Sequence, residues 1–190
     1  MTLLDWMAAL GALILLWVPP YWLVLHPFAA FWRERPLRLA FTVAALVATG
    51  VSLAVVWGNQ ERLFAAAGSP LWAKGVGLLL YVVEVYVAWK VTRTLGPERL
   101  IGKVEMGGAG QLHETGIYAR VRHPSYAGMM LAMVGICLLA WTQWMAAVAV
   151  VWLVLMRIMV MFEERELVKR FGAPYEEYRR RVPAFLPIRF

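Results

Sequence analysis

The sequence predicts an all-α, polytopic membrane protein with about five transmembrane helices, and three observations lead to this fold class. Hydrophobic residues make up 62% of the 190 residues and charged residues only 16%, with ten Trp, a composition far from that of soluble domains. Apolar runs of the length that a helix needs to cross a bilayer recur along the chain. Basic residues gather in alternate loops between these runs. We therefore expect a single membrane domain over residues 1–190.

The first three spans are expected at residues 3–25, 37–57 and 71–91. Pro19 and Pro20 are predicted to break the first span near its end, because proline lacks the N–H that an α-helix needs. This run has Asp5 in place of a basic leader and no small-residue cleavage site, so it differs from a signal peptide and should remain as a helix.

Residues 125–162 form one apolar stretch of about 38 residues, which is too long for a single span. Its only interruption is Trp141-Thr142-Gln143-Trp144, so the pattern predicts a helix-turn-helix hairpin with its turn there. A hairpin over residues 126–165 would bring the polar segment 116–128 and the charged run 163–166 to the same membrane face. We expect a binding site at that face.

The loops give a topology. With the N-terminus outside and the C-terminus in the cytoplasm, the cytoplasmic loops and tail hold 17 of the 19 Lys and Arg residues, as the positive-inside rule requires. This arrangement accounts for the net charge of +7 without nucleic acid, and it places basic side chains near anionic membrane lipid. The cytoplasmic stretch 92–122, with glycines at 107, 108 and 110, is expected to fold over the site as a lid, and a short basic helix carrying Tyr175 and Tyr178 is expected to cap it.

Two charged residues lie inside the predicted spans, where such residues are rare and are usually paired or functional. Glu84 and Arg157 each lie six residues from a cytoplasmic marker, so their depths in the membrane match. One interpretation is an ion pair between the third and fifth spans. The other is that Arg157 faces a cavity and binds a polar or anionic substrate group.

The polar residues of the two clusters are aromatic, basic and acidic, a combination that suits a zwitterionic ligand with a flat ring. The three His residues show no metal-ligand spacing, so no metal is expected, and the single Cys137 cannot form an internal disulfide. The converging side chains are Tyr118, Arg122, His123, Tyr126, Arg157, Glu163 and Glu164.

Residues 110–187 carry an ordered series of short motifs. In order these are Leu112, Gly116-Ile117-Tyr118, Arg122-His123-Pro124-Ser125-Tyr126 with Gly128, Glu163-Glu164, Leu167, Phe171-Gly172, Tyr175, Tyr178 and Val182-Pro183. In these residues the chain resembles the isoprenylcysteine carboxyl methyltransferases and the related phospholipid methyltransferases, integral membrane enzymes that use S-adenosylmethionine. Residues 101–190 would then be the methyltransferase-like, cofactor-binding part, while residues 1–100 match only as three apolar spans.

The resemblance implies which residues surround S-adenosylmethionine, with the hairpin and the C-terminal tail enclosing it. The methyl acceptor would be a lipophilic small molecule or a prenylated substrate that enters from the membrane, and whether it is a carboxylate, a thiol or an amine stays open. Arg157 is the expected substrate contact, and Glu164 or Glu163 would take a proton from a neutral acceptor. The expected cofactor residues are Gln111, Leu112, His113, Tyr118, His123, Pro124, Ser125, Tyr126 and Glu163.

Two positions depart from the family's pattern, and two other functions stay open. Gly110 stands where the family often has a His, and Met159 stands where the prenylcysteine enzymes have an Arg that serves the substrate carboxylate. The identity of the substrate therefore does not follow from that of the cofactor. Membrane sterol reductases, which use NADPH, carry a similar Arg-His-x-x-Tyr-x-Gly segment, and a non-catalytic membrane scaffold would bind neither cofactor.

Overall fold

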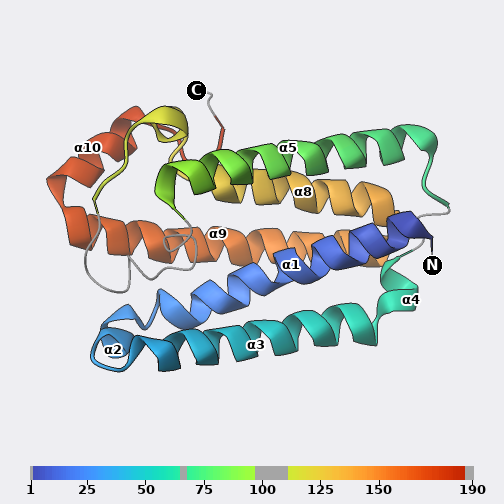
Figure 1. The fold of residues 1–190 in the computed structure, drawn as a ribbon, viewed down its shortest axis with the longest axis horizontal. Coiled ribbons are helices and arrows are strands. Elements are labelled where there is room, and N and C mark those ends of the chain that lie inside the picture. Colours follow the sequence, from blue (N-terminus) through green and yellow to red (C-terminus); the bar gives the residue numbers. More distant parts are fainter. Residues whose placement is uncertain (1, 65–67, 97–110, 187–190) are drawn as a thin grey trace.

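The computed structural model describes residues 2–64, 68–96 and 111–186. Within these ranges the chain is helical and contains no strand, and the long helices lie roughly side by side (Figure 1). The helices are α1 (Leu3–Leu25), α2 (Ala29–Arg33), α3 (Leu37–Gly58), α4 (Gln60–Leu63), α5 (Leu71–Leu95), the 3₁₀ turn η2 (Gly116–Ala119), α8 (Pro124–Ala140), α9 (Gln143–Phe171) and α10 (Ala173–Arg181).

Four of these helices, α1, α3, α5 and α9, are long and apolar enough to cross a membrane. This confirms the all-α polytopic class. The fourth predicted span, α8, is an apolar helix of only 17 residues, or about 25 Å at 1.5 Å per residue against a hydrocarbon thickness of about 30 Å. It packs mainly along α5, so it lies within the bundle as the short arm of a hairpin.

The predicted hairpin turn is confirmed between α8 and α9. Trp141 ends α8 in the left-handed conformation, with φ 53° and ψ 38°. Thr142 then caps α9, because its hydroxyl oxygen accepts a hydrogen bond from the Met145 N–H at 3.0 Å. The same hydroxyl donates to the Leu63 carbonyl at 2.9 Å, which fixes the turn against α4.

The predicted break at Pro19 and Pro20 is wrong, because α1 is continuous to Leu25. A proline at position 19 leaves the carbonyl of Leu15, four residues earlier, without its helical donor. The indole N–H of Trp152 in α9 donates to that carbonyl at 2.7 Å. A neighbouring helix thus satisfies the freed backbone group, which is how membrane helices tolerate proline.

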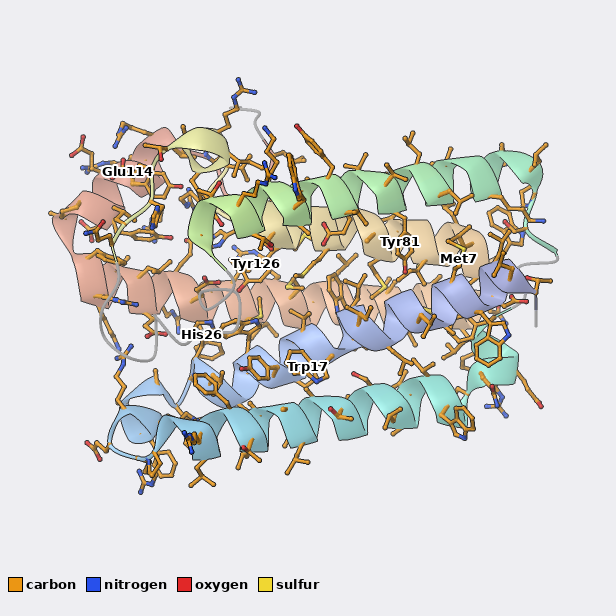
Figure 2. All side chains as sticks on the ribbon, viewed as in Figure 1. Met7, Trp17, His26, Tyr81, Glu114 and Tyr126 are labelled. Atoms are coloured by element: carbon orange, nitrogen blue, oxygen red, sulfur yellow. The ribbon has the colours of Figure 1, made fainter. Side chains whose placement is uncertain are left out.

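Two further side-chain hydrogen bonds tie α1 to its neighbours (Figure 2). The Trp17 indole donates to the Thr49 hydroxyl of α3 at 3.3 Å, and the Tyr81 hydroxyl of α5 donates to the Met7 carbonyl at 3.4 Å. Both hydrogen bonds join apolar helices, and an unpaired polar group in apolar surroundings is costly. Together with the Trp152 bond, they make α1 the shared element of the bundle.

The predicted ion pair between Glu84 and Arg157 is not formed. Glu84 Oε2 is buried without a hydrogen-bond partner and lies against Gly128 of α8, since a Cβ built there would be 2.0 Å from this oxygen. Arg157 is exposed on α9. The depth estimate did not fix which way each helix faces, and α5 packs chiefly on α8 rather than on α9.

Glycines allow α5 and α8 to approach closely at Gly77 and Gly135. A Cβ at Gly135 would lie 2.8 Å from the Gly77 carbonyl oxygen, which belongs to the backbone and cannot move aside. Gly135→Ala is therefore expected to lower the unfolding free energy by about 1–3 kcal/mol. Gly75→Ala is the matched control, because no atom lies within 4 Å of its Cβ. Thermal unfolding in detergent would check both, and equal stability of the two variants would contradict this account of the packing.

The expected lid glycines at 107, 108 and 110 lie outside the described residues. The N-terminus-outside orientation also stays a prediction, because the helices alone give spans without a direction.

Candidate functional site

A cavity of about 300 Å³ lies where α5 ends and α8 begins. Its walls come from α1, α5, α8, α9, α10 and the segment before α8. All nine of the expected cofactor residues line it. Its aromatic lining includes Tyr118, Tyr126, Phe171 and Tyr175, and α5 contributes mainly apolar residues.

The segment before α8 has the sequence needed to aim its side chains into the cavity. Gly116 opens the 3₁₀ turn with φ +62°, a conformation that favours glycine. His123 is the N-cap of α8 and Pro124 its first residue, a position that proline suits because no N–H is needed there. The His123 and Tyr126 rings stack with centroids 5.7 Å apart, which holds both rings at the cavity wall.

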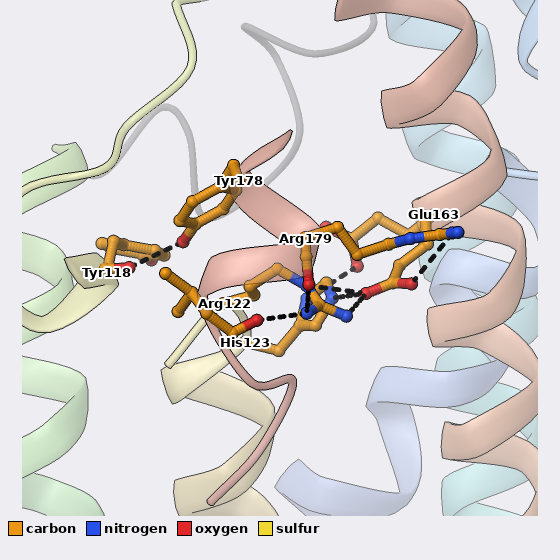
Figure 3. Close-up of polar contacts among 8 residues, drawn as sticks. Tyr118, Arg122, His123, Glu163, Tyr178 and Arg179 are labelled. Carbon is orange, nitrogen blue, oxygen red and sulfur yellow. Dashed lines mark hydrogen bonds and ion pairs between the residues drawn. The ribbon is translucent and has the colours of Figure 1, made fainter. Parts of the chain in front are cut away.

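An ion-pair network fixes the start of α8 to α9 (Figure 3). The Arg122 guanidinium donates to Glu164 Oε1, with Nε 3.1 Å from that oxygen. His123 Nε2 lies 3.1 Å from the same oxygen, and Arg179 is 3.9 Å from the other carboxylate oxygen. Glu164 is thus bound by groups from two segments, the start of α8 and α10, and it lies outside the lining of the cavity.

The C-terminal tail closes the site through backbone hydrogen bonds. The N–H groups of Arg122 and His123 donate to the carbonyls of Pro183 and Ala184, each at 2.9 Å. The Arg122 guanidinium also donates to the carbonyls of Arg179, at 3.0 Å, and Val182. These bonds place the tail beside the cavity, as the expected cap requires.

Two tyrosines of α10 reach the cavity from the tail. The Tyr178 hydroxyl donates to the Tyr118 carbonyl at 2.7 Å (Figure 3), and burial raises the pKa of Tyr178 to about 12. Burial also raises the pKa of Tyr175, whose hydroxyl is buried without a hydrogen-bond partner. Both phenols therefore stay protonated at neutral pH, and the Tyr175 hydroxyl is available to a ligand.

Glu163 presents the acidic group of the cavity. Its Oε2 is buried and makes no hydrogen bond, and it lies 3.9 Å from His123 Nδ1. A buried carboxylate oxygen without a donor is costly unless a ligand supplies one. The cavity thus combines aromatic walls with a carboxylate suited to a cation or to hydroxyl donors. Among the described residues, no group of three or more His, Cys, Asp or Glu side chains is placed to hold a metal ion.

Comparison with known proteins gives the family. Residues 72–174 match the phospholipid methyltransferase family. The chain belongs to this family.

Two curated relatives are also similar. Methanethiol S-methyltransferase 2 of Bradyrhizobium diazoefficiens is 37% identical over 158 residues, which cover 83% of this chain and 53% of that protein. Protein-S-isoprenylcysteine O-methyltransferase of Schizosaccharomyces pombe is 38% identical over 80 residues, or 38% of this chain and 31% of that protein. The chain thus spans about half the length of the first relative and less of the second. No solved structure matches.

The phospholipid methyltransferase match covers most of the cavity but not all of it. Trp22, Tyr175 and Tyr178 line the cavity from outside residues 72–174.

The sequence reasoning missed Trp22 and the α5 residues of the wall, because only the packing of α1 and α5 around α8 brings them there. Tyr175 and Tyr178 could be anticipated from the sequence, because they were expected on a short helix that caps the site. Arg157, the expected substrate contact, is exposed and outside the cavity lining. The α5 residues of the wall are Ala88, Val91, Thr92 and Leu95.

Proposed function

We propose that this integral membrane protein is an S-adenosylmethionine-dependent methyltransferase that acts on a lipophilic acceptor. One observation carries the proposal: the nine residues expected to hold the cofactor, drawn from separate segments, converge on a single cavity in a phospholipid methyltransferase family member. Neither the reductase nor the scaffold interpretation gains a specific observation.

The cavity fits S-adenosylmethionine in its chemistry. Aromatic walls suit a purine ring, and a volume of about 300 Å³ lies at the lower end of the range for small-molecule sites. Glu163 Oε2, buried and without a donor, suits the cationic and hydroxyl groups of this cofactor. We infer that the Tyr118 and Tyr126 side of the cavity holds the ring and that Glu163 holds a polar or cationic group.

S-adenosylmethionine supplies a methyl group activated by a positively charged sulfur. The protein's contribution is to hold the reactants in line and to exclude water, and proximity of this kind accounts for much of the catalysis in a displacement reaction. Arg122 and the tail carbonyls fix the start of α8, so His123 and Tyr126 keep their positions. Glu164, bound by Arg122 and His123, orients His123, whereas Glu163 is the carboxylate of the pair that lines the cavity and could take a proton from a neutral acceptor.

The acceptor is proposed to be lipophilic because α5 contributes apolar side chains to the cavity wall. The relatives include a methyltransferase named for a small thiol and one named for prenylated cysteine, so thiol and carboxylate acceptors are the first to test. With the N-terminus outside, the site faces the cytoplasm, and prenylated or lipid-like molecules reach it from the membrane.

Calorimetry with S-adenosylhomocysteine and NADPH tests the proposal on the detergent-purified protein. We expect S-adenosylhomocysteine to bind with a dissociation constant of about micromolar and NADPH not to bind. Binding of NADPH alone would favour a reductase, and binding of neither would favour a scaffold. Either result would overturn the proposed activity.

A further inference from the structure

A second hollow, here called the basic hollow, lies where the end of α1 and α2 meet the last turns of α9. It has a volume of about 520 Å³ and is separate from the cofactor cavity. Figure 2 shows His26 at the end of α1, beside α9. The charged and titratable residues of the basic hollow are His26, Arg33, Arg165, Glu166, Lys169 and Arg170.

The basic hollow has a large excess of positive charge. Four Arg and Lys side chains face a single carboxylate, Glu166. That carboxylate binds His26 Nδ1 at 2.9 Å and also the Arg33 guanidinium, so it ties α1 and α2 to α9. Arg165 and Lys169 are exposed on the rim. The positive charge of the hollow therefore suits an anion. Glu166 holds the surrounding helices in place.

The surroundings of the basic hollow indicate a membrane surface. Phe28 and Phe31 are 58% and 46% exposed beside it, and the Arg35 guanidinium lies 3.4 Å from the Phe31 ring centroid. Exposed apolar rings next to Arg and Lys are typical of segments that lie in the headgroup region. His26, which lines the hollow, directly follows Leu25, the last residue of the apolar helix α1. It thus lies at the level of lipid headgroups.

We propose that the basic hollow binds the phosphate headgroup of an anionic phospholipid. Arg and Lys side chains bind phosphate oxygens through charge-assisted hydrogen bonds, and basic pockets between membrane helices suit such headgroups. The acyl chains would extend along the apolar surface of the bundle, where Phe28 and Phe31 are exposed. This binding site is independent of methyl transfer.

The basic hollow and the cofactor cavity share a wall. Trp22, which lines the cavity, stacks on His26 of the hollow with ring centroids 4.8 Å apart and planes 16° apart. On α9, Glu163 faces the cavity, whereas Arg165 and Glu166 face the hollow. A headgroup bound there would hold the end of α1 against α9 directly behind the cavity.

Native mass spectrometry of delipidated protein tests the proposal, with dioleoyl phosphatidylglycerol and dioleoyl phosphatidylcholine as probes. We expect the protein to retain phosphatidylglycerol in preference, and Arg165→Gln with Lys169→Gln to weaken that binding by roughly tenfold or more. Arg62→Gln with Lys74→Gln is the matched control, because it removes the same charge at the opposite end of the bundle. Both rim residues are exposed, and circular dichroism would confirm that the variants fold.

Three outcomes would overturn the proposal. Phosphatidylcholine could bind as tightly as phosphatidylglycerol, or the two double variants could lose the same affinity. In the third, millimolar inorganic phosphate would displace phosphatidylglycerol completely, which would assign the hollow to a soluble phosphate instead. Binding of S-adenosylhomocysteine, measured on the same samples, reports separately on the proposed methyltransferase function.

Discussion

Arg122→Met is expected to destabilise the protein by about 2–5 kcal/mol, because the partly buried Glu164 carboxylate keeps only His123 and the more distant Arg179 and two carbonyls lose a donor. The Arg122 guanidinium joins Glu164 of α9 to the carbonyls of Arg179 and Val182 in the C-terminal segment. Its loss also weakens the attachment of the tail, which keeps only the backbone hydrogen bonds from residues 122 and 123. Thermal unfolding in detergent should show a lower midpoint, and calorimetry should show weaker binding of S-adenosylhomocysteine.

Three companion variants make the result specific. Arg180→Met removes an exposed guanidinium from α10 and should change little. Arg122→Lys keeps the charge but not the planar fork, so its stability should be intermediate. Adding Glu164→Gln to Arg122→Met should recover part of the loss, because no partly buried negative charge then lacks its guanidinium partner. If Arg122→Met unfolded at the same temperature as Arg180→Met, the network would not be what holds the tail.

The sequence predicted the helices well because their signals are local. The first predicted span, 3–25, has the bounds of α1, and the spans at 37 and 71 begin where α3 and α5 begin. Hydropathy alone carries this information, since lipid demands long apolar helices. The break at Pro19 was wrong for a non-local reason: the group that compensates for the proline is Trp152, on a helix far along the chain.

The candidate site was predictable only in part. Tyr118, His123, Tyr126 and Glu163 were expected together because a hairpin brings the ends of its arms to one face. Trp22 enters from α1, which no pattern in the first hundred residues linked to the site. The expected ion pair of Glu84 failed for the same reason, because equal depth in the membrane leaves the rotation of each helix undetermined. At 100° per residue, that rotation decides which side chains meet.

Glu163→Gln is expected to weaken binding of S-adenosylmethionine by roughly tenfold to a hundredfold, the range for a lost hydrogen bond to a charged group. The unfolding temperature should stay close to that of the wild type, because Glu163 Oε2 makes no hydrogen bond within the protein. This separates Glu163 from Glu164, whose replacement by Gln should lower stability by weakening the network with Arg122. Calorimetry and thermal unfolding on the same preparations measure both quantities.

Comparing two ligands shows what Glu163 recognises. S-adenosylhomocysteine lacks the sulfonium charge but keeps the amino group and the ribose. If the carboxylate attracts the sulfonium, Glu163→Gln should weaken S-adenosylmethionine binding more than S-adenosylhomocysteine binding. If it accepts hydrogen bonds from the ribose or the amino group, both affinities should fall equally. Glu176→Gln, on the exposed surface of α10, is the control and should change neither affinity. If Glu163→Gln folded and kept both affinities, Glu163 would not be part of the binding site.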